Sequence, residues 1–417
     1  MKNILIEQNI HWQHKLYTSV KRKLLNKLIS YIDLKQIITI TGIRRCGKST
    51  LAKQAINHLI ESGIETQNIF FINLENPLFL EYKNDPAYLD VIFQEYLKLM
   101  NPKGKIYCIF DEIQYFENWQ VYIKSKYEMS DIKYIITGSN SSMLSNDLNT
   151  LLSGRSLNIH LDTFDFTEFL DYKNISHTTQ FEQIQNKIDI SRAKDEYIKW
   201  GGFYEVFEVE DELVKKEILL SYVKNIIYQD IVPRYKIRNT QIVERLFFYL
   251  LSNATTLLNY TTLSQTFEIS DKSIKEYINY FEDTFMLKRL DKFHNKPKER
   301  IKSFKKIYAL DNGFLQIAPK LSTNMGNSFE NIVFNVLNQK YDDIYYLRDT
   351  YEVDFFCDNK LFQVSYDNSN PKTKQREINS FEHFNKAKTY QNILVTYDIN
   401  EFQEDIEIQG FENLIFG

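Results

Sequence analysis

The sequence predicts an α/β fold: a mainly parallel sheet with helices on both faces. Apolar, β-branched runs recur through the N-terminal part of the chain, and most are separated by spacers long enough for a helix. Polar motifs follow directly after the first and third runs, where parallel sheets bind their ligands. The runs lie at residues 36–41, 69–74, 106–110, 134–137 and 157–161.

The composition is that of an ordinary globular protein with several domains. The 417 residues are enough for about three domains of roughly 150 residues each. Glycine (12) and proline (7) are scarce, which excludes collagen-like and low-complexity architectures. The net charge is only −4, with 51 basic against 55 acidic residues, so any contact with nucleic acid has to come from a local basic patch.

Cysteines and apolar segments indicate a reducing, aqueous compartment. Cys46, Cys108 and Cys357 lie far apart and form no CxxC pair, which excludes a disulfide scaffold and a zinc ribbon. No apolar run approaches the ~18 residues of a membrane-spanning helix, and residues 1–16 lack the apolar core of a signal peptide. We therefore expect a cytoplasmic protein with no membrane partner.

The first motif has the pattern of a phosphate-binding loop. Residues 36–60 read QIITITGIRRCGKSTLAKQAINHLI, a strand-like run followed by a turn and a helical pattern. The turn has the spacing Gly42-x4-Gly47-Lys48-Ser49, in which backbone N–H groups and a helix N-terminus cradle phosphates. Lys48 would reach the terminal phosphates and Ser49 would offer its hydroxyl to Mg²⁺. The residues expected to contact ATP are Gly42, Ile43, Arg44, Arg45, Cys46, Gly47, Lys48, Ser49 and Thr50.

The second motif is an acidic pair at the end of the run KIYCIFDE, residues 105–112. Asp111 would lie beside the phosphate loop and hold Mg²⁺, and Glu112 is the natural general base for an attacking water. A carboxylate in that position favours hydrolysis over phosphoryl transfer to a metabolite. The alternative is a strand that merely ends in a polar cap.

Three further residues follow or precede strand-like runs. Ser139 and Asn140 end the segment KYIITGSN, where either could sense the terminal phosphate or orient water; the alternative is a simple turn. Arg155, in LLSGRS, comes just before the last run. It could stabilise transition-state charge in its own or a neighbouring subunit, or be a surface charge.

An ordered set of segments resembles one family. GIRRCGKST, IYCIFDEIQYFENWQ, ITGSNSSML, LLSGRS with FDFTEFL, and GGFYEV together are similar to the prokaryotic AAA-type ATPases of the archaeal-ATPase branch, over nearly the whole chain. The resemblance implies a sensor role for Asn140 and a sensor or finger role for Arg155. It also implies an AAA-like P-loop ATPase domain at 1–200 with a helical lead-in at 1–35, a winged-helix region at 201–310, and a restriction-endonuclease-like domain at 311–417.

The middle region has a pattern of its own. Two helical segments, at 260–270 and 271–286, are joined by a tight link, and two strand-like runs follow around a basic loop. Helices followed by a hairpin are the winged-helix arrangement, related to helix-turn-helix DNA readers. Residues 286–306 hold nine Lys or Arg against two acids, which makes DNA a candidate partner. The alternatives are a solvated wing or a hairpin that packs internally.

The C-terminal region carries the pattern of a magnesium-dependent nuclease site with one departure. Glu330 lies on an amphipathic helix, and Asp354 and Gln363 follow on two strand-like runs. Such a site holds Mg²⁺ with carboxylates and adds a lysine that steadies the attacking hydroxide. Ser365 stands where that lysine is expected, and Lys372 or Lys374 would have to replace it. We therefore expect a nuclease-like fold with a degenerate site, serving for binding or assembly; the alternative for Asp354 is an ordinary acid.

Together these observations predict an ATP- and Mg²⁺-dependent ATPase. Its hydrolysis would drive or switch C-terminal domains that contact DNA through residues 286–306. One alternative is a regulatory ATPase that works through another protein or a second copy of the chain and ignores nucleic acid. The other is a nuclease under the control of ATP.

Overall fold

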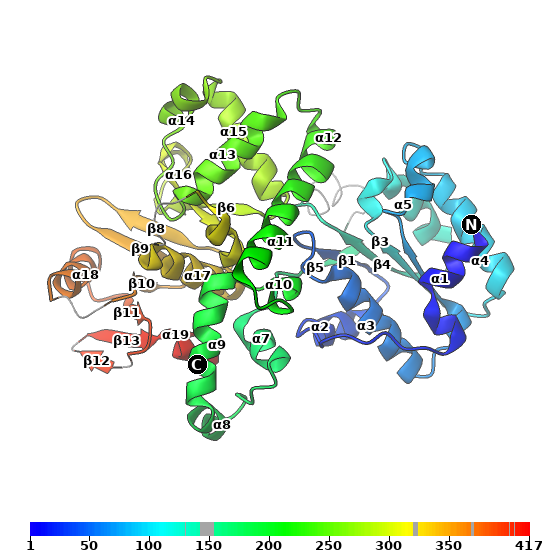
Figure 1. Ribbon diagram of the computed structural model, residues 1–417, viewed down its shortest axis with the longest axis horizontal. Coiled ribbons are helices and arrows are strands. Elements are labelled where there is room, and N and C mark those ends of the chain that lie inside the picture. The colour runs from blue at the N-terminus through cyan, green and yellow to red at the C-terminus, as the bar shows by residue number, and fades with distance from the viewer. Residues whose placement is uncertain (130, 142–153, 320–323, 368–370, 400, 404) are drawn as a thin grey trace. The chain divides into compact units, whose positions relative to one another are not determined.

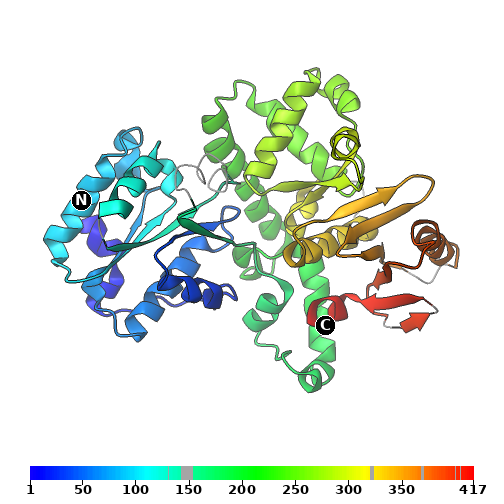
Figure 2. The same cartoon turned by 180° about the vertical axis from the view of Figure 1, so that it is seen from behind.

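The computed structural model describes residues 1–129, 131–141, 154–319, 324–367, 371–399, 401–403 and 405–417. Two units each have their own dense internal packing. Figures 1 and 2 show the elements of each unit from opposite sides. No helix in the described ranges is long and apolar enough to cross a membrane. The first unit is Met1–Thr163 with Asp283–Phe285, and the second is Phe164–Glu282 with Met286–Gly417.

The first unit contains a five-stranded sheet in which all neighbouring strands are parallel. This confirms the predicted α/β fold, and the strand positions agree with the apolar runs to within about two residues at most ends. Non-consecutive neighbours require crossovers, which the helices provide. In sheet order the strands are β2 (Ile69–Asn73), β3 (Ile106–Asp111), β4 (Ile132–Gly138), β1 (Ile37–Thr41) and β5 (Ser156–His160).

Helices cover both faces of this sheet. Side chains of α1 (Lys2–Gln8), α4 (Tyr88–Met100) and α5 (Trp119–Met129) join alternate strand residues in one apolar cluster. Because successive strand side chains point to opposite faces, the remaining apolar strand residues face the other layer. That layer includes α2 (Leu25–Ile32), which contacts β1, and α3 (Lys48–Glu61), which contacts β4.

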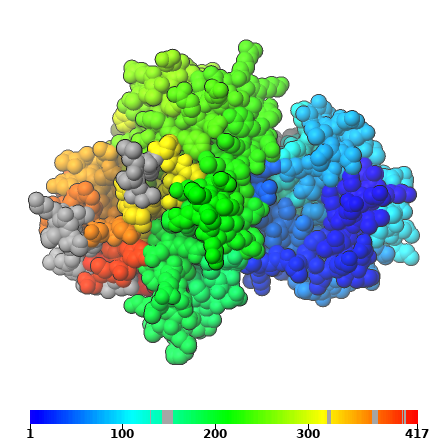
Figure 3. Space-filling view, viewed as in Figure 1, coloured from blue at the N-terminus to red at the C-terminus, as the bar shows by residue number. Residues whose placement is uncertain are grey.

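The N-terminal lead-in is fixed to the helix that begins at the phosphate loop. Its extended segment, residues 17–22, lies along α3. Asn57 on α3 donates from Nδ2 to Tyr17 O (2.7 Å) and accepts at Oδ1 from the Tyr17 N–H (3.0 Å). Gln54 Nε2 donates to Val20 O (2.6 Å) in the same way. Figure 3 shows the lead-in, in dark blue, on one face of the first unit.

The second unit is a set of helices followed by a mixed sheet of eight strands. The helices are α7 (Phe166–Tyr172), α8 (Gln180–Gln185), α9 (Lys187–Trp200), α10 (Tyr204–Phe207), α11 (Glu212–Asn225), α12 (Val232–Tyr235), α13 (Thr240–Ser252), α14 (Tyr260–Phe267), α15 (Asp271–Asp283), α16 (Pro297–Lys302), α17 (Met325–Lys340), α18 (Pro371–Phe384) and α19 (Phe411–Phe416). In sheet order the strands are β12 (Glu401–Gln403), β13 (Ile406–Gly410), β11 (Gln391–Thr396), β10 (Lys360–Ser365), β9 (Glu352–Cys357), β8 (Tyr345–Arg348), β6 (Leu287–Lys292) and β7 (Lys305–Ala309).

The hairpin β6–β7 belongs to this sheet. β6 pairs antiparallel with β7 and parallel with β8, where Asp291 lies opposite Tyr345. The outer edge of β7 is covered by the segment at residues 255–258, through hydrogen bonds such as Leu258 N–H to Lys305 O (2.7 Å). The helices α13, α14 and α15 and the C-terminal strands therefore meet at the hairpin, as one continuous structure (Figure 1).

The paired glycines that precede α10 allow a close approach inside the second unit. Gly201 has φ 74°, and a Cβ there would lie 2.0 Å from Asp311 Oδ1. The Gly202 N–H donates to Asp311 Oδ2 (2.8 Å), and the Gly313 N–H donates to Oδ1 (2.8 Å). The glycines thus let the chain after α9 pack directly on the turn that follows β7.

Candidate functional site

The phosphate loop joins β1 to α3 at the carboxyl end of β1. Gly42 and Gly47 have φ of 154° and 101°, and a Cβ on Gly42 would lie 2.0 Å from Leu161 O. Gly47 caps α3, so Lys48 is the first residue of the helix. The first N–H groups of a helix have no partner within it, and they carry the positive end of its dipole. The loop therefore presents a concave set of donors suited to phosphate oxygens.

Lys48 and Glu112 form a buried ion pair under this loop. Lys48 Nζ lies 3.4 Å from Glu112 Oε1 and also donates to Gly42 O (3.2 Å) and Ile43 O (3.1 Å). Burial alone would lower the pKa of Lys48, but the Glu112 carboxylate raises it above its ordinary value. Burial alone would raise the pKa of Glu112, but the Lys48 ammonium lowers it. Both groups are therefore charged at neutral pH.

Asp111 ends β3 and accepts three side-chain donors. Ser49 Oγ donates to its Oδ2 and Oδ1 (2.8 and 2.9 Å), Thr137 Oγ1 donates to Oδ1 (2.7 Å), and Asn73 Nδ2 donates to Oδ2 (2.8 Å). Burial first, and then the charge of Glu112, raise the pKa of Asp111. The Ser49 hydroxyl and the Asp111 carboxylate are oxygen ligands of the kind Mg²⁺ prefers, and they lie together at the start of α3.

Glu112 is held in place by the strand beside it. Its φ is 55°, and its N–H donates to Thr137 Oγ1 (2.9 Å). Gln114 Nε2 donates to Glu112 Oε2 and to Ser139 Oγ (3.1 Å). Because β4 runs parallel to β1, Ser139 and the buried Asn140 emerge beside the phosphate loop, at the same edge as Glu112. Gln114, which sequence reasoning missed, thus links the two carboxyl-end segments.

The two arginines inside the loop differ in their contacts. Arg44 forms an ion pair with Glu75, and its Nη1 donates to Tyr115 OH (3.2 Å). Tyr115 OH in turn donates to Glu75 Oε1 (2.9 Å). Arg45 adopts a left-handed backbone conformation with φ 71°. The Arg44 side chain therefore braces the loop against the end of β2, and its role as a nucleotide contact stays a prediction.

Arg22 is a second residue of the site that sequence reasoning missed. Its side chain is fully buried, and it donates from Nη1 to Cys46 O in the phosphate loop and from Nη2 to Asp162 O (2.9 Å). A Cβ on Gly47 would lie 2.7 Å from Arg22 Nη1. The only sequence signal is that Arg22 is the single arginine among residues 1–35. The lead-in therefore supports the loop from behind.

Arg155 lies at the amino ends of the strands, whereas the phosphate loop lies at their carboxyl ends. It directly precedes β5, whose first residue, Ser156, pairs with Ile37 at the start of β1. Its carbonyl accepts the Ile37 N–H (2.8 Å), and its Nη1 lies 2.7 Å from Glu128 Oε1. The phosphate loop follows the other end of β1, about 16 Å away along a five-residue strand. The structure therefore does not bring Arg155 to the ATP site of its own chain. A role in a neighbouring subunit stays a prediction, with a surface charge as the alternative.

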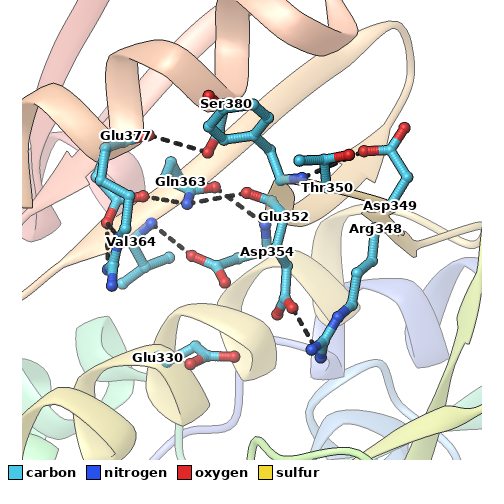
Figure 4. A pocket seen from close by; sticks show the side chains of 12 residues that line it. Glu330, Arg348, Asp349, Thr350, Glu352, Asp354, Gln363, Val364, Glu377 and Ser380 are labelled. Atoms are coloured by element: carbon cyan, nitrogen blue, oxygen red, sulfur yellow. Dashed lines mark hydrogen bonds and ion pairs between the residues drawn. The ribbon is translucent and has the colours of Figure 1, made fainter.

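In the second unit, the predicted nuclease residues line one polar pocket. Glu330 from α17, Asp354 from β9 and Gln363 from β10 border a cavity of about 510 Å³ (Figure 4). Lys306 from β7 lies among the acids, and its Nζ is 3.2 Å from Glu330 Oε1 and 3.5 Å from Asp354 Oδ1. The side chains of Lys372 and Lys374 lie outside the described residues. Ser365 Oγ donates to Asp367 O (3.2 Å).

The basic segment 286–306 has fewer available cations than its sequence indicates. Five of its nine bases contact other side chains: Lys288 with Asn338, Arg289 with Glu282, Arg300 with Tyr345, Lys305 with Asp291, and Lys306 with the acids of the pocket. Lys292, Lys296, Lys298 and Lys302 have no ion-pair partner in the described part of the chain. These four lysines are therefore the cations of this segment that are most available to a partner.

The fold and the site define a class of protein. A parallel sheet with a phosphate loop after β1 and an acidic pair after β3 is the arrangement of an AAA-type P-loop ATPase. In agreement, a family model described as "AAA domain" matches residues 34–170, and one described as "Domain of unknown function (DUF8612)" matches residues 191–324. The chain belongs to the AAA-type P-loop ATPases that carry a C-terminal domain of unknown function.

Two relatives match nearly the whole chain. An uncharacterized protein of Methanocaldococcus jannaschii, MJ1544, is 32% identical over 431 residues, which cover 99% of this chain and 93% of that protein. An uncharacterized protein of Haemophilus influenzae is 31% identical over 401 residues, which cover 93% of this chain and 95% of that protein.

Among solved structures, the Aeropyrum pernix ORC1 protein in complex with DNA is similar over 68% of this chain and 87% of that chain, with 8% identity and a TM-score of 0.32. AMPPCP-bound DnaA from Aquifex aeolicus is similar over 65% and 90%, with 14% identity and a TM-score of 0.28.

Proposed function

We propose that the first unit binds MgATP and hydrolyses it, with Glu112 as the general base. The observation that carries the proposal is the buried Lys48–Glu112 pair beside the Ser49–Asp111 pair, at the N-terminus of α3. The residues present fit both groups: the loop offers backbone donors and an ammonium to phosphates, and the second pair offers oxygens to Mg²⁺. Bound Mg²⁺ would supply neutralisation of phosphate charge.

The remaining steps belong to residues of this chain. Lys48 leaves Glu112 and donates to the terminal phosphate oxygens, which frees the carboxylate. Glu112 is ionised at neutral pH, so it can accept the proton of an attacking water. Gln114 and Asn140 orient that water and the leaving phosphate from the ends of neighbouring strands. Because Lys48 exchanges Glu112 for the terminal phosphate, the binding of ATP itself activates Glu112 as the base.

Glu112→Gln is the test of this assignment. We expect the variant to bind ATP with nearly unchanged affinity and to lose turnover by a factor of at least about 100, because the amide cannot take a proton. Lys48→Ala should instead lose ATP binding. Fluorescent-nucleotide titration and phosphate release measure the two effects separately. Retained turnover in Glu112→Gln would refute the base assignment, and retained binding in Lys48→Ala would refute the role of the loop.

For the second unit, we propose a DNA contact through a winged helix. The helices α13, α14 and α15 followed by the hairpin β6–β7 have the order of that motif, and α16 extends the hairpin with further bases. Lys296, Lys298 and Lys302 are exposed, and Lys292 is half-buried. Four neutralised phosphates would give a slope of about −4 in log affinity against log salt.

The experiment compares ATP turnover at low salt with and without duplex or single-stranded DNA, with Glu112→Gln as the blank. Stimulation that disappears when these four lysines are changed to glutamine would support the DNA contact. The matched control changes two exposed lysines elsewhere in the second unit, Lys187 and Lys386. Turnover that ignores DNA in all variants would refute the DNA contact. It would favour the alternative, a switch that acts through protein partners.

A further inference from the structure

Lys306 lies buried against three of the acids that border the pocket in the second unit. Its side chain is only 4% exposed, and its Nζ lies 2.6 Å from Glu352 Oε1, 3.2 Å from Glu330 Oε1 and 3.5 Å from Asp354 Oδ1. An ammonium group has three donors and no acceptor, so three carboxylates can satisfy it completely. These acids come from α17 and β9, and the lysine comes from β7.

The carboxylates have further donors besides Lys306. Asp354 Oδ2 accepts the Val364 N–H (3.0 Å), and Glu352 Oε2 lies 3.1 Å from Arg348 Nη1. Glu330 Oε1 also accepts from Tyr308 OH (2.8 Å). The protein itself therefore supplies charge or a hydrogen bond to each acid.

The side-chain amide of Gln363, which would complete a metal site, is also occupied by hydrogen bonds within the protein. Gln363 Oε1 accepts the Asp354 N–H (3.1 Å), and its Nε2 donates to Glu352 O (3.2 Å) and to the Glu377 carboxylate. Glu377, labelled in Figure 4, in turn pairs with Arg376. Gln363 thus links β9 to α18 by hydrogen bonds, and its side-chain oxygen faces the backbone of β9.

A divalent metal does not fit this arrangement. Mg²⁺ needs several oxygens at about 2.0–2.1 Å in octahedral geometry, and its charge would repel an ammonium held by the same acids. In the part of the chain that is described, no three His, Cys, Asp or Glu side chains are grouped so that they could hold a metal ion.

We propose that Lys306 is a built-in counter-ion that takes the place of the divalent cation in this nuclease-like pocket. The second unit then folds and works without a metal at this position. Ser365 is consistent with this role, because a second lysine two residues after Gln363 would add a cation to a cluster that already has one. Since Lys306 belongs to the hairpin β6–β7, the same ammonium also fastens the hairpin to α17 and β9. The proposal is independent of the ATPase assignment.

The test uses the full chain with Asp111→Asn, which removes the carboxylate proposed to hold Mg²⁺ at the ATP site, and no nucleotide. In this background we expect no Mn²⁺ uptake by electron paramagnetic resonance titration and no cleavage of plasmid DNA with Mg²⁺ or Mn²⁺. Adding Lys306→Met should lower the melting temperature by roughly 5–10 °C, because the acids lose their counter-ion. Mn²⁺ should then restore part of the loss, and Asp354→Asn should abolish that restoration.

Three results would overturn the proposal. The first is Mn²⁺ binding with Lys306 in place that disappears in Asp354→Asn, which would make the pocket a metal site. The second is metal-dependent DNA cleavage that Lys306→Met abolishes, which would make Lys306 a catalytic lysine that has moved to another strand. The first result is measured only on chains that retain Lys306, so the proposal stays testable even if Lys306→Met fails to fold. A folded Lys306→Met chain that is as stable as its parent would also overturn it.

Discussion

Asp111 and Glu112 are adjacent in sequence, yet their surroundings drive their pKa values in opposite directions. Asp111 faces hydroxyl and amide donors, and burial together with the neighbouring charge raises its pKa. Glu112 faces the Lys48 ammonium, which lowers its pKa despite burial. Two carboxylates with different surroundings can take different roles, here metal ligand and base. The division depends on Lys48, so the shape of the loop that places Lys48 matters as much as the acids.

Arg22 is the residue that we expect to hold that shape. In Arg22→Lys, one ammonium cannot replace a guanidinium that donates to both Cys46 O and Asp162 O. Loss of one charge-assisted hydrogen bond to the loop should raise the dissociation constant for ATP roughly tenfold. Isothermal titration of a nucleotide analogue on the folded protein measures the effect. A neighbouring exposed lysine, Lys21, provides the control as Lys21→Gln.

A purely structural role for Arg22 would give another pattern. The melting temperature would fall, but the folded fraction would bind ATP with the wild-type dissociation constant. That combination would contradict a positioning role.

At the scale of elements, the lead-in is held to the sheet through a buried histidine. His11 is completely buried, and its Nε2 lies 3.0 Å from Ile69 O at the start of β2. Burial lowers the pKa of His11 to about 4, and the hydrogen bond to Ile69 only partly offsets this. An unfolded chain has a histidine pKa near 6.5, so it binds more protons than the folded chain between these values. The contribution of His11 to stability is therefore complete above about pH 6.5 and is lost as the pH falls toward 4.

The lowered pKa of His11 predicts that the free energy of unfolding decreases as the pH falls. Between pH 7 and pH 5, protonation linked to His11 should lower the free energy of unfolding by about 2 kcal/mol. His11→Gln has no proton to take up, so its unfolding free energy should fall by that much less over the same interval. Urea unfolding followed by tryptophan fluorescence at the two pH values measures the difference. His14→Gln, an exposed position in the same segment, should behave like wild type; equal slopes for His11→Gln and wild type would contradict the assignment.

The elements also show what the sequence could and could not predict. The phosphate loop and the Asp111–Glu112 pair are contiguous, and apolar runs precede both, so their place at strand ends could be predicted from local pattern alone. Arg22 and Lys306 could not be predicted in this way, because their partners lie on other elements and no motif surrounds them. The composition of its segment predicts that Lys306 belongs to a basic surface, whereas the fold buries it among the acids of the pocket. Counting charges along a segment cannot distinguish a cation that faces solvent from one that faces an acid.

At the scale of the molecule, strand direction decides where a charge can act. All five strands of the first unit are parallel, so residues that precede strands and residues that follow them lie at opposite edges. Arg155 precedes β5, whereas the phosphate loop and the acidic pair follow β1 and β3. If Arg155 takes part in hydrolysis, it has to do so at the ATP site of another copy, through a head-to-tail interface.

Mixing two inactive variants tests this. Arg155→Ala retains Glu112 but lacks the arginine for its neighbour, and Glu112→Gln retains Arg155 but lacks the base. In a random equal mixture, about a quarter of head-to-tail interfaces would join an intact Glu112 to an intact Arg155, so turnover should recover to about a quarter of wild type. The control is a chain that carries both Arg155→Ala and Glu112→Gln. Mixed with Arg155→Ala in the same way, it supplies no arginine and should restore no turnover. Wild-type turnover in Arg155→Ala alone would show that the arginine is not needed, and the absence of recovery in mixed oligomers of confirmed size would rule out action between copies.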